Sequence, residues 1–319
     1  MIDAFDEPRI RAAVDVRTAV DAIRAAFRAD GLGQTIVPPV INLQIPADVG
    51  EFHIKTAFVE GVPFVAVKVA SGFYGNAAKG LTTGSGMMAL FDAATGLPSA
   101  LLMDNGFLTD LRTGAAGAVA ADVLARRDAA SVAMIGSGVQ GRFQLRCLKV
   151  VRPIARVMAW SPNRARLERY CAEIAAELGI AAIAASSAED ACRGADIIVT
   201  ATPSRAPIVR ADWLRPGVHV TALGSDSPGK QELEAACLSR ADLVVTDRTA
   251  QCEAFGELRH AIEAGSIRAS DVHAQLGEVV AGKKSGRTSD RQITIADLTG
   301  VGFQDTAIAA AVKARLMAG

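Results

Sequence analysis

The sequence predicts an α/β protein of two domains, in which an antiparallel β-rich domain precedes a domain of alternating strands and helices. A length of 319 residues fits about two domains, and the strand-like and alternating regions follow one another along the chain. Half of the residues are hydrophobic, and 34 basic residues balance 34 acidic ones. This composition excludes a disordered chain, and it leaves no global positive field for binding nucleic acid or an anionic membrane.

The first domain is expected to span residues 1–121 and to be mostly β. It opens with an amphipathic helix over residues 17–30, because Val20, Ile23 and Phe27 recur at helical spacing and Gly31 follows. Strands are then expected at 36–45, 51–59, 63–71, 86–92 and 99–103. An alanine-rich helix starting at Leu111 leads into the second domain, and a helix within 303–319 is expected to return to the first.

The second domain, residues 122–302, alternates strand and helix and therefore predicts a parallel sheet covered by helices. Its strands are expected at 131–135, 157–160, 180–184, 197–200, 219–223 and 243–246, with helices at 140–150 and 162–178. Ser161 followed by Pro162 is the order expected of an N-cap and a first helical position.

A glycine-rich loop lies between the first strand and helix of this domain. Gly136, Gly138 and Gly141 fit the G-x-G-x-x-G pattern of a Rossmann dinucleotide site. Gly136 would form the tight turn, Gly138 would let the backbone approach a pyrophosphate, and the helix N-terminus would favour its charge. A tight turn without a ligand is the structural alternative.

The end of the second strand bears on which dinucleotide binds. An acidic residue is usual there, where it accepts hydrogen bonds from the adenosine ribose, but residues 159–164 contain no carboxylate. Ser161, Asn163 and Arg164 would suit a 2′-phosphate instead. We expect NAD or NADP, with a slight preference for NADP, although Arg164 would serve equally as a solvated helix residue.

Cysteine and histidine spacing gives no support for a metal site. The five cysteines form no Cys-x-x-Cys pair, so reduced, buried thiols are expected, and the four histidines lack ligand spacing. No apolar run approaches the length of a membrane span, and the acidic start lacks the order of a signal peptide. A cytoplasmic protein is therefore expected.

Several segments together resemble one known family. They are Ala66–Val69, Gly96–Pro98, Leu108–Thr113, Gly136–Gly141, Ala195–Thr202, Gly224–Leu233 and Gly302–Asp305. Along nearly its whole length the chain resembles the ornithine cyclodeaminase/mu-crystallin family. The resemblance implies a Rossmann domain, an antiparallel substrate domain that forms a homodimer, and hydride chemistry at an α-amino or α-imino acid with a nicotinamide cofactor.

The resemblance also implies roles for individual residues. Lys68 and Arg112 would bind the α-carboxylate, and Asp226, acting with Lys68, would be the catalytic acid or base beside the reacting nitrogen. Thr299 would lie against the substrate. The residues expected along the cofactor are Thr83, Arg112, Thr113, Val139, Gln140, Thr202, Leu223 and Lys230. The purely structural alternatives are a surface position on a strand for Lys68 and a turn-forming role for Asp226.

Two departures from ornithine cyclodeaminase bear on the substrate. An additional arginine is missing from residues 37–42, and His53 and Lys55 lie about where a glutamate is expected. His53 and Lys55 share one strand face, so with Lys68 and Arg112 they would form a positive pocket with few counter-charges. Glu51 shares that face and would absorb some charge; alternatively, Lys55 is a solvated residue facing away from the pocket.

A pocket with an excess of positive charge would repel the ammonium group of ornithine and favour a second carboxylate. The leading hypothesis is NAD(P)H-dependent reduction of a small α-imino acid, such as iminosuccinate to aspartate. One alternative is an ornithine-type cyclodeaminase, which releases ammonia with catalytic NAD. Another is a mu-crystallin-like protein that binds a nucleotide and a small ligand without turnover.

Overall fold

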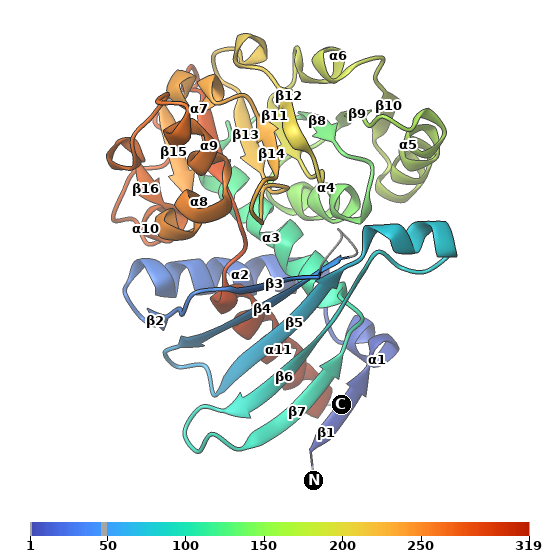
Figure 1. Ribbon diagram of the computed structural model, residues 1–319, viewed down its shortest axis with the longest axis vertical. Coiled ribbons are helices and arrows are strands. Elements are labelled where there is room, and N and C mark those ends of the chain that lie inside the picture. The colour runs from blue at the N-terminus through green and yellow to red at the C-terminus, as the bar shows by residue number, and fades with distance from the viewer. Residues whose placement is uncertain (1, 46–49, 319) are drawn as a thin grey trace. The chain divides into compact units, whose positions relative to one another are not determined.

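The computed structural model describes residues 2–45 and 50–318 (Figure 1). It divides into two compact units, Met1–Arg112 with Val301–Gly319 (unit 1) and Thr113–Gly300 (unit 2). The division falls inside helix α3 (Phe107–Leu124), earlier than the expected boundary after residue 121. The hydrogen bonds explain this position: Arg112 is bonded to Asp305 of unit 1, whereas the Thr113 carbonyl accepts from Gln144 of unit 2.

Unit 1 is built on a seven-stranded sheet in the order β1-β7-β6-β5-β4-β2, with β3 also paired to β4. Its strands are β1 (Asp3–Asp6), β2 (Thr35–Ile36), β3 (Ile41–Ile45), β4 (Gly50–Val59), β5 (Phe64–Gly72), β6 (Gly84–Asp92) and β7 (Pro98–Met103). All pairs are antiparallel except β1 with β7. The sheet is therefore antiparallel as expected, apart from an unpredicted first strand at its edge.

Two other details of unit 1 differ from the expectation. The predicted strand at 36–45 is interrupted, because Pro38 and Pro39 cannot donate ladder hydrogen bonds. The short helix α1 (Glu7–Ala12) and a 3-10 helix (Tyr74–Lys79) were not predicted.

Helices α2 (Val16–Gly31) and α11 (Gly302–Ala318) belong to unit 1, and α11 packs on β4, β5 and α2 (Figure 1). Thr306 of α11 donates to the Ala57 carbonyl at 2.8 Å and accepts from the Ala66 amide at 3.2 Å. The rings of Phe27 and Phe303 meet edge to face, 5.2 Å apart. These contacts bury one face of the sheet beneath the C-terminal helix.

Unit 2 is a parallel sheet in the order β10-β9-β8-β11-β13-β17-β15-β16, the doubly wound arrangement of a Rossmann domain. The strands are β8 (Ser131–Ile135), β9 (Arg156–Trp160), β10 (Ala181–Ala184), β11 (Ile197–Thr200), β13 (His219–Ala222), β15 (Leu243–Thr246), β16 (Ala274–Gln275) and β17 (Thr294–Asp297). β12 (Arg205–Val209) and β14 (Gln231–Leu233) form a separate pair.

The helices of unit 2 are α4 (Val139–Val151), α5 (Arg164–Leu178), α6 (Ala188–Cys192), α7 (Ala236–Arg240), α8 (Thr249–Phe255), α9 (Glu257–Glu263) and α10 (Leu276–Val280). The expected N-cap of α5 was wrong by two residues. Asn163, whose side chain accepts from the Arg166 amide, is the N-cap in place of Ser161. Both residue types cap well, so the sequence left the register open.

All five cysteines are buried free thiols, as predicted. Burial raises the pKa of Cys147, Cys192 and Cys237 to about 12, which keeps these thiols protonated and unreactive. Within the described residues, no helix combines the length and apolarity needed to cross a membrane.

Candidate functional site

The loop Gly136–Gly141 connects β8 to α4 and has glycine at three positions, two of which leave no room for a side chain. Gly136 has φ of 116°, and a Cβ there would lie 2.5 Å from the Ala201 carbonyl oxygen. A Cβ at Gly141 would lie 2.6 Å from the Gly136 carbonyl oxygen. At Gly138, the N-cap of α4, the nearest atom would be 3.9 Å away, so the space above that amide is open. This arrangement fits a dinucleotide pyrophosphate.

A buried carboxylate organises the neighbouring loops after β11 and β13. Glu232 accepts from the Thr200 hydroxyl and the Thr202 amide, both at 2.6 Å, and from the Gly224 amide at 2.7 Å. Burial raises the pKa of Glu232, while these donors oppose that shift. Glu232 therefore holds the backbone at Thr202 close to the end of β13, where Leu223 is buried.

Asp226 and Lys230, the predicted acid or base and a predicted cofactor residue, form an ion pair with 2.8 Å between Oδ1 and Nζ. The two residues lie in one turn, where Gly229 has φ of 81°. The Lys230 side chain is buried, while that of Asp226 is 39% exposed. Asp226 is thus accessible and has a defined cationic neighbour.

The residues proposed for the adenosine end of the cofactor lie at the starts of α4 and α5. The hydroxyls of Ser137 and Ser161 are 2.8 Å apart, which ties the glycine loop to the end of β9. Val139 is exposed and Gln140 is half-buried at the first turn of α4. Arg164 is instead directed to Glu168 at 2.7 Å and to the Ala185 carbonyl at 3.0 Å.

Three other predicted residues do not belong to these loops. Thr83 is exposed in unit 1, where its carbonyl accepts from the Phe73 amide. Thr113 begins unit 2 and pairs through its carbonyl with Gln144 at 3.0 Å. Thr299 is buried in unit 2, where its hydroxyl donates to Asp247 at 3.0 Å and accepts from Gln251 at 2.7 Å. The Thr299 hydroxyl therefore has an evident structural role.

A second constellation lies in unit 1, where β5, α3 and α11 bring two buried cations onto one carboxylate. Lys68 Nζ is 3.4 Å from Asp305 Oδ2, and Arg112 Nε donates to Asp305 Oδ1 at 3.0 Å. Arg112 Nη1 donates to the Gln304 side-chain oxygen at 3.0 Å. Lys68 is 1% exposed and Asp305 is fully buried, so this group is held in a defined geometry.

Lys55 and His53 lie on the same buried sheet face as Lys68. Lys55 is directly opposite Lys68 in the β4–β5 ladder, a position at which side chains approach closely. The pKa of Lys68 is lowered to about 7, mainly because the side chain is buried; Asp305 opposes this shift, whereas the charges of Arg112 and Lys55 add to it. The alternative that Lys55 is a solvated outward residue is therefore wrong.

The expectation of few counter-charges in this cluster was also wrong. Asp305 is shared by Lys68 and Arg112, and Glu51 Oε1 lies 3.4 Å from His53 Nε2. The His53 Nδ1 atom is 2.7 Å from the Asn42 side-chain oxygen. The positive surplus is smaller than the strand sequences suggested, because Asp305 comes from a helix more than 190 residues further along the chain.

Among the described residues, no group of three or more histidine, cysteine, aspartate or glutamate side chains is arranged to hold a metal ion. The candidate site consists of the glycine loop and the Asp226–Lys230 pair in unit 2 and of the Lys68–Asp305–Arg112 cluster in unit 1.

A family model described as the ornithine cyclodeaminase/mu-crystallin family matches residues 6–319. The chain belongs to this family. It is 46% identical to a Sinorhizobium fredii protein named as an uncharacterized cyclodeaminase, over 91% of this chain and 88% of that protein.

Three solved structures share the fold along the chain. An archaeal alanine dehydrogenase dimer with bound NAD has a TM-score of 0.92 and 35% identity, covering 99% of this chain and 96% of its own. The Thermococcus litoralis Δ1-pyrroline-2-carboxylate reductase with NADH and L-proline has a TM-score of 0.95 and 28% identity, covering 99% of this chain and 98% of its own. The Paracoccus denitrificans iminosuccinate reductase with NAD+ has a TM-score of 0.90 and 34% identity, covering 99% of this chain and 97% of its own.

Two residues that order these sites, Asp305 and Glu232, were not singled out from the sequence. Both occur in segments that carry the family resemblance, Gly302–Asp305 and Gly224–Leu233, so a signal was present. Their partners are far away in the chain, and only the folded topology shows that each is a buried carboxylate between distant elements.

Gly138→Ala separates a structural role of the glycine loop from a binding role. The added methyl has no atom within 3.9 Å, so the free energy of unfolding should change by less than about 1 kcal/mol. It would, however, fill the approach to the Gly138 amide, so the Kd for NAD(P)H should rise at least tenfold, as measured by calorimetry. Gly75→Ala, also in open space, is the matched control and should alter neither value. Unchanged affinity in Gly138→Ala would rule out pyrophosphate binding at this loop.

Proposed function

We propose that the protein is an NAD(P)H-dependent oxidoreductase that reduces a small α-imino acid to the L-amino acid, and catalyses the reverse oxidation. The Lys68–Asp305–Arg112 cluster is the observation that supports this most strongly. Two buried cations share one carboxylate, and a substrate α-carboxylate would complete their neutralisation. Relatives that act on alanine, iminosuccinate and pyrroline-2-carboxylate support the same class of substrate.

The two residues of the cluster have complementary tasks. Arg112 offers a planar fork whose Nε and Nη1 are already oriented by Asp305 and Gln304, so its binding geometry costs little entropy. Lys68 offers a compact charge that is present only below its lowered pKa of about 7. Together they would bind the α-carboxylate and orient the imine carbon.

A bound nicotinamide would supply the hydride, and the glycine loop of unit 2 would hold its diphosphate. Asp226 would carry the proton at the substrate nitrogen, because it is the accessible carboxylate of the Asp226–Lys230 pair. Lys230 would hold the Asp226 carboxylate in one orientation through their 2.8 Å contact.

For the specific substrate we propose a dicarboxylic imine, with iminosuccinate reduced to aspartate. The support is Lys55, which is buried directly opposite Lys68. A second carboxylate of the substrate, about one side-chain width from the first, would therefore contact Lys55. The cyclodeaminase alternative has an observation in its favour too: Glu51 is buried beside His53 and would suit a cationic substrate end.

A comparison of imine substrates tests this proposal. We expect NAD(P)H oxidation with oxaloacetate plus ammonia to exceed that with pyruvate plus ammonia or with Δ1-pyrroline-2-carboxylate. Lys55→Met should lower kcat/KM for the dicarboxylic imine about tenfold or more, while the value for the pyruvate-derived imine changes little. Lys79→Met, an exposed lysine of the same unit, is the control.

Reduction of only the monocarboxylic or cyclic imine would overturn the dicarboxylate assignment and leave the reaction class in place. Ammonia release from ornithine without net NAD reduction would instead establish the cyclodeaminase reaction. The absence of both activities would contradict an enzymatic function.

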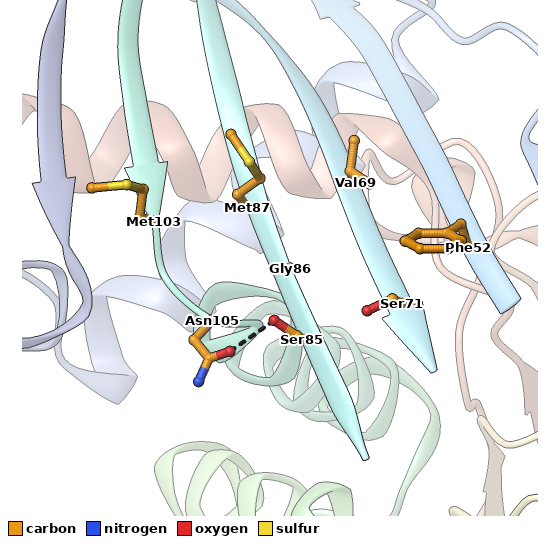
Figure 2. Close-up of a pocket in the computed structure, with 8 residues that line it drawn as sticks. All are labelled: Phe52, Val69, Ser71, Ser85, Gly86, Met87, Met103 and Asn105. Carbon is orange, nitrogen blue, oxygen red and sulfur yellow. Dashed lines mark hydrogen bonds between the residues drawn. The ribbon is translucent and has the colours of Figure 1, made fainter. Parts of the chain in front are cut away.

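We also propose that the protein forms a homodimer through the outer face of the unit 1 sheet. Phe52, Val69, Met87 and Met103 project from four strands on the face away from α11 and line a hollow of about 390 Å³ (Figure 2). Met87 is 38% exposed and Met103 is 46% exposed, and exposed apolar surface of this kind is typical of interfaces. The related alanine dehydrogenase is described as a dimer.

Met87→Lys should therefore convert a dimer into a monomer, because it places a charge in the middle of the apolar face. Multi-angle light scattering measures the mass directly. Leu97→Lys, at an exposed turn of the same unit, should leave the dimer intact. A wild-type monomer, or a dimer unaffected by Met87→Lys, would refute this interface.

A further inference from the structure

A cavity of about 540 Å³ opens between the first turn of α4 and the N-terminal half of α5, next to the glycine loop. Three arginines, Arg142, Arg166 and Arg169, line it together with Val139, Asn163, Ala165 and Glu173. In a Rossmann domain the adenosine ribose of a dinucleotide lies beside the end of the second strand, which is β9 here. The substituent at the ribose 2′ position of a bound dinucleotide would therefore lie at this cavity.

The polar groups at the end of β9 do not favour an unmodified ribose. Residues 159–164 provide no carboxylate to accept hydrogen bonds from a 2′-hydroxyl. Asn163 caps α5 with its side-chain oxygen, and Ser161 is bonded to Ser137. The charged residues that line the cavity are three arginines and Glu173.

The three arginines at the cavity differ in the contacts that their guanidinium groups make within the protein. Arg142 is ion-paired with Glu173, and its guanidinium also donates to the carbonyls of Ser137 and Gly138. Arg166 and Arg169 are exposed and lie one turn apart on α5. Among the residues that the structure describes, neither of these two guanidinium groups has an ion pair or a hydrogen-bond acceptor. Arg166 Nη2 is 3.9 Å from the position of a Cβ at Gly138, so it lies beside the cofactor loop.

We propose that Arg166 and Arg169 bind the 2′-phosphate of NADP(H), which makes the phosphorylated cofactor the preferred one. The inference rests on the proposed NAD(P)H-dependent function and adds the specificity of its cofactor site. Guanidinium groups suit this ligand because their paired N–H donors match phosphate oxygens and their charge is permanent. Arg164, expected at this site from the sequence, is instead paired with Glu168 and does not line the cavity.

Equilibrium binding of NADP+ and NAD+ tests the proposal without turnover. We expect calorimetry to give a Kd for NADP+ at least tenfold below that for NAD+ in the wild-type protein. Arg166→Ala and Arg169→Ala should each raise the Kd for NADP+ about tenfold and leave that for NAD+ nearly unchanged. Arg156→Ala is the matched control, because this exposed arginine lies at the opposite end of β9.

Three results would overturn the proposal: equal or tighter binding of NAD+ by the wild type, equal weakening of both nucleotides in the two variants, or loss of the NADP+ preference in Arg164→Ala alone. If NAD+ binds but the 2′-phosphate brings no advantage, only the specificity inference fails. If neither nucleotide binds, the proposed function fails with it.

Discussion

The carboxylate of Asp305 is the constraint on which the candidate substrate site depends. Two cations, Lys68 and Arg112, are buried on one side of an antiparallel sheet, and burying such charges without a partner is costly. Asp305 reaches both of them from the first turn of α11. The C-terminal helix, which packs on β4 and β5, is therefore part of the candidate site as well as of the core.

Unit 2 uses a buried carboxylate in a similar way. Glu232 connects the loops after β11 and β13, and the three glycines shape the loop after β8. In both units a side chain from a late segment fixes groups that come from earlier ones. The chemistry that we propose needs both arrangements, since one provides carboxylate recognition and the other provides the cofactor cradle.

Several parts of the candidate site were predictable from local sequence patterns. Alternation along residues 51–59 placed Glu51, His53 and Lys55 on one face, and the glycine spacing identified the cofactor loop. What the sequence left open depends on long-range pairing. The charge balance around Lys68 depends on Asp305, and the role that we propose for Arg166 depends on the contact between α4 and α5; no local periodicity encodes either.

The carboxylate-binding role that we propose for protonated Lys68, held by Asp305, is tested by comparing the pH dependence of kcat/KM between the wild type and Asp305→Asn. This profile reports groups of the free enzyme, and the pKa of Lys68 is about 7 because burial lowers it while Asp305 raises it. For the imino acid that the wild type reduces, activity should fall as pH rises through this pKa, and removing the Asp305 charge should move that fall to lower pH. A fall at the same pH in both proteins would contradict this role of Lys68.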